Sequence, residues 1–234
     1  MPERQLHFLL FPGVTLLDLV GPLTVLRSLP APYRAVVVGE HLDAMETETT
    51  MKVVAEETVA QSRPPFAVIV PGGPGGLAAM TNEAIHQYLR RCAASADVVA
   101  SVCTGSLILA AAGLLDGRRA TTHWAYAGEL ERLGATYVRQ RWVEDGKFIT
   151  AAGISAGIDM ALALAARFTD EATARRIQLS IEYDPQPPFG GIAWDHVGDA
   201  ERTRQRQTGT GALLAANAAE IFASRPDLLR KLRG

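Results

Sequence analysis

One cysteine lies where an apolar segment gives way abruptly to a helical pattern. Residues 98–102 (VVASV) predict a buried strand, Cys103 follows, and residues 105–115 carry small and apolar residues at helical spacing. Such a turn lifts its side chain to the carboxyl edge of a sheet and directs the first free N–H groups of the helix toward it. Because the positive end of a helix favours an anion, we expect the Cys103 thiol to be exposed, with a lowered pKa. Cys103 is therefore predicted to be a nucleophile.

The other cysteine, Cys92, has a different setting. It lies inside the helical pattern of residues 84–94, where a free cysteine usually packs as a small apolar side chain. The same interpretation is open for Cys103, although its place at a strand-to-helix turn favours chemistry. Two cysteines do not form the framework of a secreted disulfide scaffold, so we expect a reducing, cytoplasmic location.

An acid stands in an apolar setting early in the chain. Asp18 lies in the segment 16–22, LLDLVGP, and burying an unpaired carboxylate is costly. A helix cap or a surface position would explain it. Alternatively, Asp18 contacts Cys103 and the two groups share one proton, because two neighbouring acids do not both ionise easily. Such a pair would supply a nucleophile and an acid together.

Glycines follow another predicted strand, in the segment 71–76, PGGPGG. The segment has neither a following Gly-Lys-Ser/Thr nor a dinucleotide-binding spacing, so nucleotide binding is poorly supported. We expect the backbone N–H groups of Gly73 and Thr104 to stabilise negative charge beside Cys103, with Gly72 lining the same pocket. A turn that requires positive φ would account for the same glycines.

Two further residues are candidates for the pocket. His123 would form a Cys–His pair if it reached Cys103, and a structural, hydrogen-bonded histidine is an equally good interpretation. Ile154 stands in a small-residue segment, GISAGID (153–159), which could close the pocket or allow close packing of a helix on the sheet. Histidines and cysteines are scattered without metal-ligand spacing, so we expect neither a metal nor a cofactor.

The elements that would position these residues alternate along the chain. Predicted strands at 6–11, 33–39, 66–70 and 98–102 are interleaved with helical patterns at 16–29, 84–94 and 105–115, and two consecutive helices follow at 154–168 and 170–183. A hairpin is expected over 142–150, and residues 51–55 suggest part of a peripheral hairpin. Alternation of this kind predicts an α/β fold with a mostly parallel sheet and helices on both faces. Ligands in such folds bind outside the carboxyl ends of the strands.

The chain is predicted to consist of an α/β domain over residues 1–185 and a helical extension over 186–234. A proline-rich connection, DPQPPFGG (184–191), separates them, and helical patterns follow near 200–207 and 212–223. We expect the extension to pack on the domain or at a dimer interface.

Composition limits the classes of partner. Of 234 residues 48% are hydrophobic, and the net charge is -2 with both signs interspersed, which argues against nucleic acid or an anionic membrane surface. The apolar run 156–166 contains Asp159 and is too short to span a bilayer. The first residues lack the layout of a signal peptide. A small-molecule substrate is the expected partner.

Taken together, these segments resemble the DJ-1/PfpI superfamily, and within it the isocyanide hydratases and the related domain of certain AraC-type regulators. The resemblance implies a flavodoxin-like α/β sandwich, usually dimeric, with the cysteine on a strained nucleophile elbow. The matching segments are LFPG (10–13), DLVGP (18–22), VPGG (70–73), SVCTGS (101–106), ATTHW (120–124) and GISAGID (153–159).

Two residues distinguish among members of this superfamily. Many members carry Glu where this chain has Asp18, and the aspartate resembles the isocyanide hydratases. Protease-like members place His directly after the cysteine, whereas this chain has Thr104. The segment after residue 183 is about half the length that two helix-turn-helix units need, so a complete regulator is not expected.

The resemblance implies a cofactor-independent hydratase that converts an isocyanide into an N-substituted formamide. Cys103 would form a thioimidate with the isocyanide carbon, and Asp18 would serve as acid and then as base. Two alternatives stay open: a glyoxalase or deglycase reaction of the same thiol, and a redox sensor in which Cys103 is oxidised without turnover.

Overall fold

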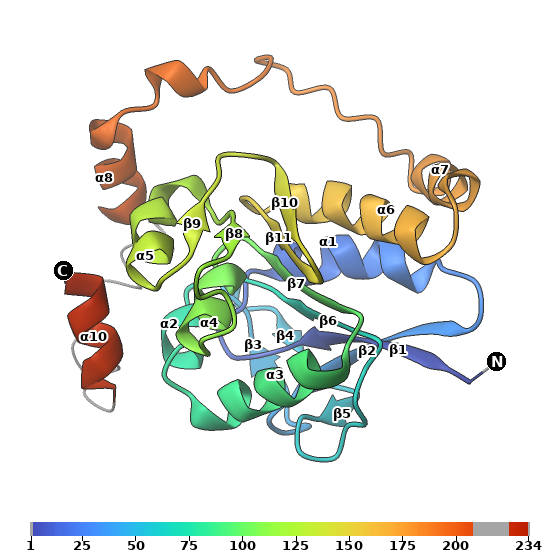
Figure 1. Cartoon of the computed structure of the whole chain (residues 1–234). Coiled ribbons are helices and arrows are strands. Elements are labelled where there is room, and N and C mark those ends of the chain that lie inside the picture. The colour runs from blue at the N-terminus through green and yellow to red at the C-terminus, as the bar shows by residue number, and fades with distance from the viewer. Residues whose placement is uncertain (1, 208–224, 234) are drawn as a thin grey trace.

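The computed structural model describes residues 2–207 and 225–233, and its centre is a seven-stranded sheet (Figure 1). The strand order is β10-β11-β7-β6-β1-β2-β5, and all neighbours are parallel except β10 and β11. The strands are β1 (Arg4–Leu9), β2 (Tyr33–Gly39), β5 (Glu57–Thr58), β6 (Ala67–Val70), β7 (Val98–Val102), β10 (Trp142–Asp145) and β11 (Phe148–Ala151).

The central strands are apolar throughout because both faces of the sheet are covered. Every residue of β6, β7 and β11 is buried, which is the pattern of a parallel sheet between two helical layers. Figure 1 shows α1 (Leu16–Arg27) and α6 (Ala156–Phe168) side by side on one face, with α2 (Gly76–Ala79), α3 (Glu83–Ser95) and α4 (Gly105–Ala111) toward the other. This arrangement confirms the predicted flavodoxin-like α/β fold.

Small residues let α6 approach the sheet and α1 closely. A side chain at Gly157 would place its Cβ 2.9 Å from Val102 Cγ1 of β7, and one at Gly21 would lie 3.2 Å from Ile158 Cγ1. The close helix–sheet packing expected of segment 153–159 is therefore confirmed. It brings the beginning of α6 against the end of β7.

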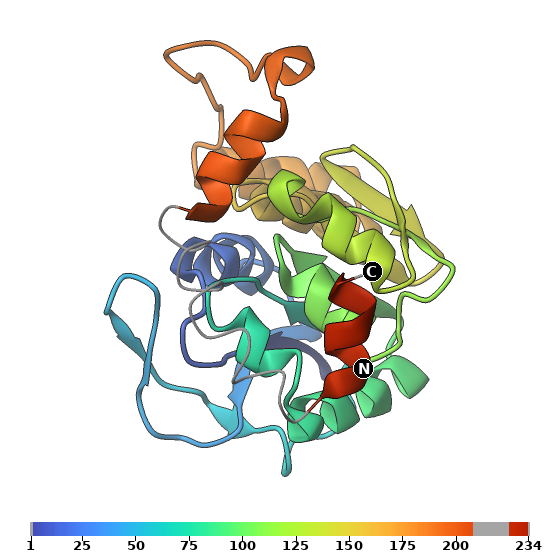
Figure 2. The same cartoon turned by 90° about the vertical axis from the view of Figure 1, so that its left-hand side faces the viewer.

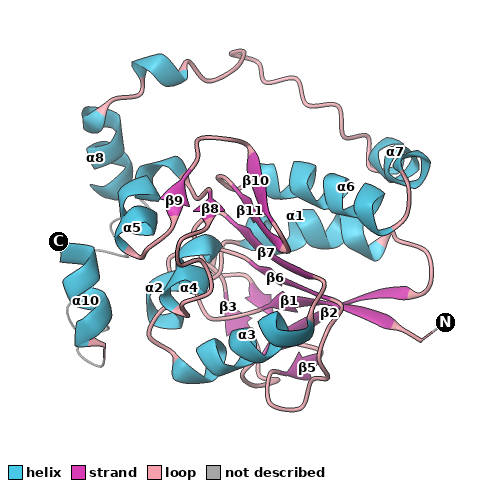
Figure 3. Cartoon of the chain, in the orientation of Figure 1, coloured by secondary structure: helices cyan, strands magenta, loops and turns pink. Residues whose placement is uncertain are grey.

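Short peripheral elements surround this frame, and Figure 3 shows how much of the remainder is loop. The hairpin predicted over 142–150 is confirmed as β10 and β11. Residues 51–55 contribute to the predicted outer hairpin, formed by β3 (Met45–Glu46) and β4 (Lys52–Val53). The others are β8 (Arg119–Ala120), which pairs with β9 (Thr136–Tyr137), the 3-10 turn η1 (Trp124–Tyr126) and α5 (Ala127–Arg132).

The last helix packed on the α/β core before the C-terminal part is α7 (Glu171–Ser180). Its N-cap, Asp170, accepts a hydrogen bond from Thr173 N at 2.7 Å. Residues 184–193 are exposed, and η2 (Trp194–His196), α8 (Asp199–Gln207) and α10 (Pro226–Arg233) follow. In Figure 2 the orange α8 and the red α10 return to the side of the molecule that carries α5. The helical pattern predicted at 212–223 lies outside the described residues, and the domain boundary at residue 185 stays a prediction.

Within the described ranges, 2–207 and 225–233, we find no helix that is both long and apolar enough to cross a bilayer.

Candidate active site

Three neighbouring strands end at one place, and their register explains why. In the parallel ladders, Val70 of β6 pairs with Ser101 of β7, and Ala151 of β11 pairs with Val102. The segments that follow these strands therefore meet at the carboxyl edge of the sheet: residues 71–73, Cys103, and residues 152–154. This is the edge where ligands bind in open parallel sheets.

The backbone at Cys103 is strained and firmly held. Its φ is 57°, a left-handed conformation that costs a side-chain-bearing residue about 1–2 kcal/mol. Its N–H donates to the carbonyl oxygens of Ala151 (3.1 Å) and Ala152 (2.9 Å). Its own carbonyl accepts from the hydroxyls of Thr122 (3.1 Å) and Ser106 (3.2 Å). These bonds fix the sharp passage from β7 into α4.

Asp18 lies in the first turn of α1 and is fully buried. Thr15 N donates to Gly72 O at 2.9 Å, and Gly72 N donates in return to Asp18 Oδ2 at 3.0 Å, so α1 begins against the glycine segment. The second oxygen, Oδ1, makes no hydrogen bond of standard geometry to a described residue. The carboxyl nevertheless interacts with the Cys103 thiol, as a hydrogen-bond partner of looser geometry and through its charge.

The pKa of Asp18 is raised to about 7 by burial, and Glu48 adds to the rise through its charge. The Gly72 N–H and the Cys103 thiol oppose this effect. Because the ordinary value is 3.8, this carboxyl exchanges its proton near neutral pH. The structure thus brings together Asp18 and Cys103, as one of the interpretations of Asp18 predicted.

The expectation of an exposed Cys103 with a lowered pKa is wrong. The residue is only 6% exposed. Burial raises the pKa of the thiol well above its usual value, and the charge of Asp18 raises it further. The backbone N–H groups of Ile154 and Thr104 offset only part of this rise. The helix end acts in the predicted direction, but desolvation of the thiolate is the larger effect.

The predicted role of Gly73 also needs correction. Its N–H donates to Thr104 Oγ1 at 3.1 Å and is therefore not free to stabilise charge beside the sulfur. Thr104 N contacts the sulfur as expected, and the second N–H comes from Ile154, a residue predicted only to line the pocket. The missed signal was its position just after β11, the other neighbour of β7.

Neighbouring groups approach the backbone of residues 71–73 so closely that Gly72 has no room for a side chain. A Cβ at Gly72 would lie 2.5 Å from Thr104 Oγ1 and 3.0 Å from Asp18 Oδ2, and Gly73 has a φ of 139°. Of the two interpretations of these glycines, the turn that requires positive φ therefore holds for Gly73. The backbone passes between the acid and the turn that carries the thiol.

His123 lies beside the site without bonding to the thiol. Its Nδ1 accepts a hydrogen bond from Ala125 N at 3.3 Å and so caps η1, and no described bond joins it to Cys103. Burial lowers the pKa of His123 to about 4, so the ring is neutral at pH 7. A Cβ at Gly153 would lie 3.0 Å from the His123 ring, which places the ring against the loop that supplies the Ile154 N–H.

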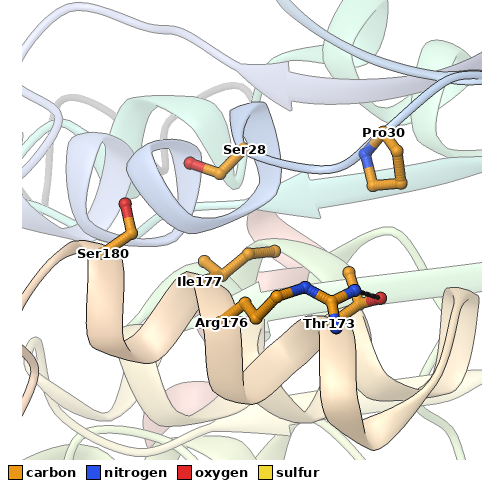
Figure 4. Close-up of a pocket in the computed structure, with 6 residues that line it drawn as sticks. All are labelled: Ser28, Pro30, Thr173, Arg176, Ile177 and Ser180. Atoms are coloured by element: carbon orange, nitrogen blue, oxygen red, sulfur yellow. Dashed lines mark hydrogen bonds between the residues drawn. The ribbon is translucent and has the colours of Figure 1, made fainter.

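A separate cavity of about 330 Å³ lies between the end of α1 and α7 (Figure 4). It is lined by residues that do not belong to the Cys103 site: Ser28, Pro30, Thr173, Arg176, Ile177 and Ser180. Within the described part of the chain, no three His, Cys, Asp or Glu side chains are grouped so as to hold a metal ion.

Known proteins share both the sequence and the fold. The model of the DJ-1/PfpI family matches residues 4–167. An isonitrile hydratase of Pseudomonas putida is 46% identical over 185 residues, which is 79% of this chain and 81% of that protein. An HTH-type transcriptional regulator of Pseudomonas aeruginosa is 32% identical over 198 residues, 81% of this chain and 56% of the regulator. The crystal structure of a ThiJ/PfpI family protein from Pseudomonas syringae superposes with a TM-score of 0.83 at 34% identity, covering 96% of this chain and 91% of that one. With the family model extending from β1 nearly to the end of α6, the chain belongs to the DJ-1/PfpI family.

Proposed function

We propose that this protein is an enzyme that adds water to an isocyanide, R–N≡C, to give the formamide R–NH–CHO. The observation that carries the proposal is the buried contact between the Cys103 thiol and a carboxyl, Asp18, whose pKa is raised to about 7. A thiol beside an acid that exchanges its proton at neutral pH can supply both a sulfur nucleophile and a proton. The similarity to the isonitrile hydratase of P. putida supports the choice of substrate.

In the first step the pair adds one sulfur and one hydrogen to the terminal carbon. With one proton on the pair, Cys103 Sγ forms the S–C bond while Asp18 gives its proton to the same carbon. The products are the thioimidate R–N=CH–S–Cys and the Asp18 carboxylate. The raised pKa of Asp18, about 7, keeps a proton available on the carboxyl near neutral pH for this transfer.

In the second step the carboxylate acts as base. Asp18 takes a proton from water while the water oxygen bonds to the thioimidate carbon, and the nitrogen then receives that proton. The tetrahedral adduct R–NH–CH(OH)–S–Cys collapses by breaking the C–S bond. Its hydroxyl proton returns to the pair, so one water is consumed and the thiol–acid pair is restored. The N–H groups of Ile154 and Thr104 that contact the sulfur would stabilise its negative charge as the C–S bond breaks.

Formamide formation from an alkyl isocyanide tests the proposal. The wild-type chain is expected to form the product, Cys103→Ala to form none, and Asp18→Asn to be slower by about 10²–10⁴-fold, the usual contribution of a general acid–base. Cys92→Ala is the matched control, since Cys92 lies on α3 beside Tyr88, and it should keep the wild-type rate.

Formamide formation by Cys103→Ala would overturn the proposal, as would a wild-type chain that forms none. Consumption of dicarbonyls by an isocyanide-inactive wild type would favour a glyoxalase or deglycase instead. Selective formation of sulfinic acid at Cys103 without either activity would favour a redox sensor. A homodimer, which the family resemblance implies, and a cytoplasmic location, which the two free cysteines favour, complete the proposal.

A further inference from the structure

Four aromatic rings contact one another around η1, and together they form what we call the aromatic wall: His123, Trp124, Tyr126 and Trp194. The ring centroids of His123 and Trp124 are 5.7 Å apart, and those of His123 and Tyr126 are 5.8 Å apart. Trp194 of η2 meets Trp124 edge-on at 6.4 Å. The wall therefore combines the turn η1 with the first turn of the C-terminal extension.

The wall adjoins the reacting sulfur through one loop. The His123 ring packs against Gly153, and the next residue, Ile154, contacts the sulfur with its N–H. Tyr126 is half-buried and packs on the core, yet its hydroxyl makes no hydrogen bond to a described residue. Burial raises the pKa of Tyr126 to about 12, and the charge of Cys103 contributes to the rise. Through His123 and Gly153, the Tyr126 ring is thus linked to the loop at the sulfur, and its hydroxyl is neutral at pH 7.

An arginine of α8 holds the other side of η1. Arg206 donates from Nε and Nη2 to the carbonyl of Ala125, at 3.0 and 2.7 Å, and Nη2 also pairs with Glu129 Oε2 at 2.6 Å. The same guanidinium lies 5.6 Å from the centroid of the Tyr126 ring. Three kinds of contact from one side chain therefore set the position of Tyr126. These contacts also explain why α8 lies against η1.

We propose that the Tyr126 ring binds the substituent R of the substrate and that Arg206, from the C-terminal extension, is the positioning residue that keeps the ring there. The chemistry of the wall selects an apolar substituent, and an aromatic one above a methyl group, because aromatic faces pack favourably on one another. The identification of R as the substituent of an isocyanide rests on the proposed function. The position of Tyr126 near the thiol is independent of that function.

The first experiment tests whether the Tyr126 ring lies near the Cys103 thiol, and it does not require the protein to hydrate an isocyanide. Cys103 is alkylated by iodoacetamide and by N-phenyl iodoacetamide in a Cys92→Ala background, and the ratio of the phenyl rate to the small-reagent rate is followed by mass spectrometry. Tyr126→Ala is expected to lower this ratio about ten-fold, the scale on which apolar pockets discriminate. Tyr126→Phe keeps the ring and should keep the ratio.

Arg206→Ala should lower the ratio in the same direction, and Arg206→Lys should restore part of it through the ion pair with Glu129. Arg175→Ala is the matched control, because Arg175 of α7 pairs with Glu171 at the surface, where both side chains are largely exposed. Thermal unfolding of each variant confirms that it is folded. An unchanged or raised ratio in folded Tyr126→Ala would refute the placement, and a ratio unaffected by both Arg206 variants would refute the positioning role.

The second experiment uses methyl and phenyl isocyanide as substrates. In Tyr126→Ala and Arg206→Ala, KM for phenyl isocyanide should rise about ten-fold relative to KM for methyl isocyanide. A general structural defect would lower both kcat values instead. If the wild type forms no formamide, the proposed function fails, and the alkylation ratio still decides the role of Tyr126.

Discussion

At Cys103 two opposing effects act on one thiol, and their magnitudes decide the outcome. The end of a helix stabilises a neighbouring anion by at most about 2 kcal/mol, which corresponds to roughly 1.5 pKa units. Full burial shifts a pKa by up to about 3–5 units in the opposite direction. The residue is only 6% exposed, so burial prevails and the pKa of the thiol is raised.

Replacing Asp18 should change how stability depends on pH. The pKa of Asp18 is raised from 3.8 to about 7 in the folded chain, so between these values the folded state binds more protons than the unfolded state. Its contribution to the free energy of unfolding therefore falls as pH rises through this window. Relative to wild type, Asp18→Asn should gain about 3 kcal/mol between pH 5 and pH 8.

Urea unfolding of both proteins at several pH values measures this difference. The comparison uses the change with pH rather than the absolute stability, so a constant loss from altered packing does not affect it. A stability difference that is the same at pH 5 and pH 8 would show that the Asp18 carboxyl titrates at its ordinary pKa.

At the scale of elements, the site depends on how closely the turn into α4 approaches the end of β6. A Cβ at Gly105, the first residue of α4, would lie 2.0 Å from the carbonyl oxygen of Val70 and 2.9 Å from the carbonyl carbon of Pro71. These are backbone atoms of the neighbouring strand and its following loop. The chain therefore needs glycine here so that Cys103 and residues 71–73 can lie side by side.

Gly105→Ala should consequently destabilise the chain by about 1–3 kcal/mol, the usual cost of overpacking, and should lower the activity because the turn at Cys103 must shift. Gly76→Ala is a matched control: Gly76 is the first residue of α2, and its nearest neighbours would be 3.8 and 3.9 Å away. Denaturant midpoints of the two variants make the comparison. Equal stability of both variants would mean that β6 and α4 are not in close contact.

For the whole molecule, two buried histidines and one half-buried histidine oppose Asp18 in the response to acid. Burial lowers the pKa values of His7, His86 and His123 to about 4. Between 6.5 and 4 the unfolded state then binds more protons, and stability falls as the pH is lowered through this range. Each histidine contributes about 3 kcal/mol, so together they outweigh the single carboxyl and the chain should lose stability below pH 6.5.

His86→Gln tests this balance. His86 lies on α3, and its Nδ1 is 3.3 Å from Arg225 Nη1, the residue before α10. Without the imidazole, the loss of stability between pH 7 and pH 5 should be smaller than in wild type, by about 2 kcal/mol. His41→Gln, at an exposed position beside Asp43, should keep the wild-type slope. Equal slopes for both variants would contradict the prediction.

The sequence by itself determined the frame of this protein. Apolar segments such as residues 98–102 form strands, small residues such as Gly157 allow α6 to pack on the sheet, and the turn at Asp145–Gly146 forms a hairpin. These features depend on local periodicity and backbone freedom, which neighbouring residues largely dictate. The pairing of Asp18 with Cys103 could also be predicted, because a carboxylate among leucines needs a partner.

Only the tertiary structure decided which polar groups pair with one another. Gly73 N donates to Thr104 Oγ1, Ile154 N contacts the sulfur instead, and Arg206 reaches the turn that carries Tyr126. These partners are distant in sequence, and strand register and the path of the C-terminal extension bring them together. The raised pKa of Cys103 was likewise decided by the tertiary structure, because the depth of burial is a property of the packed molecule. Helix-end electrostatics can be inferred from local sequence, whereas desolvation depends on every segment that covers the thiol.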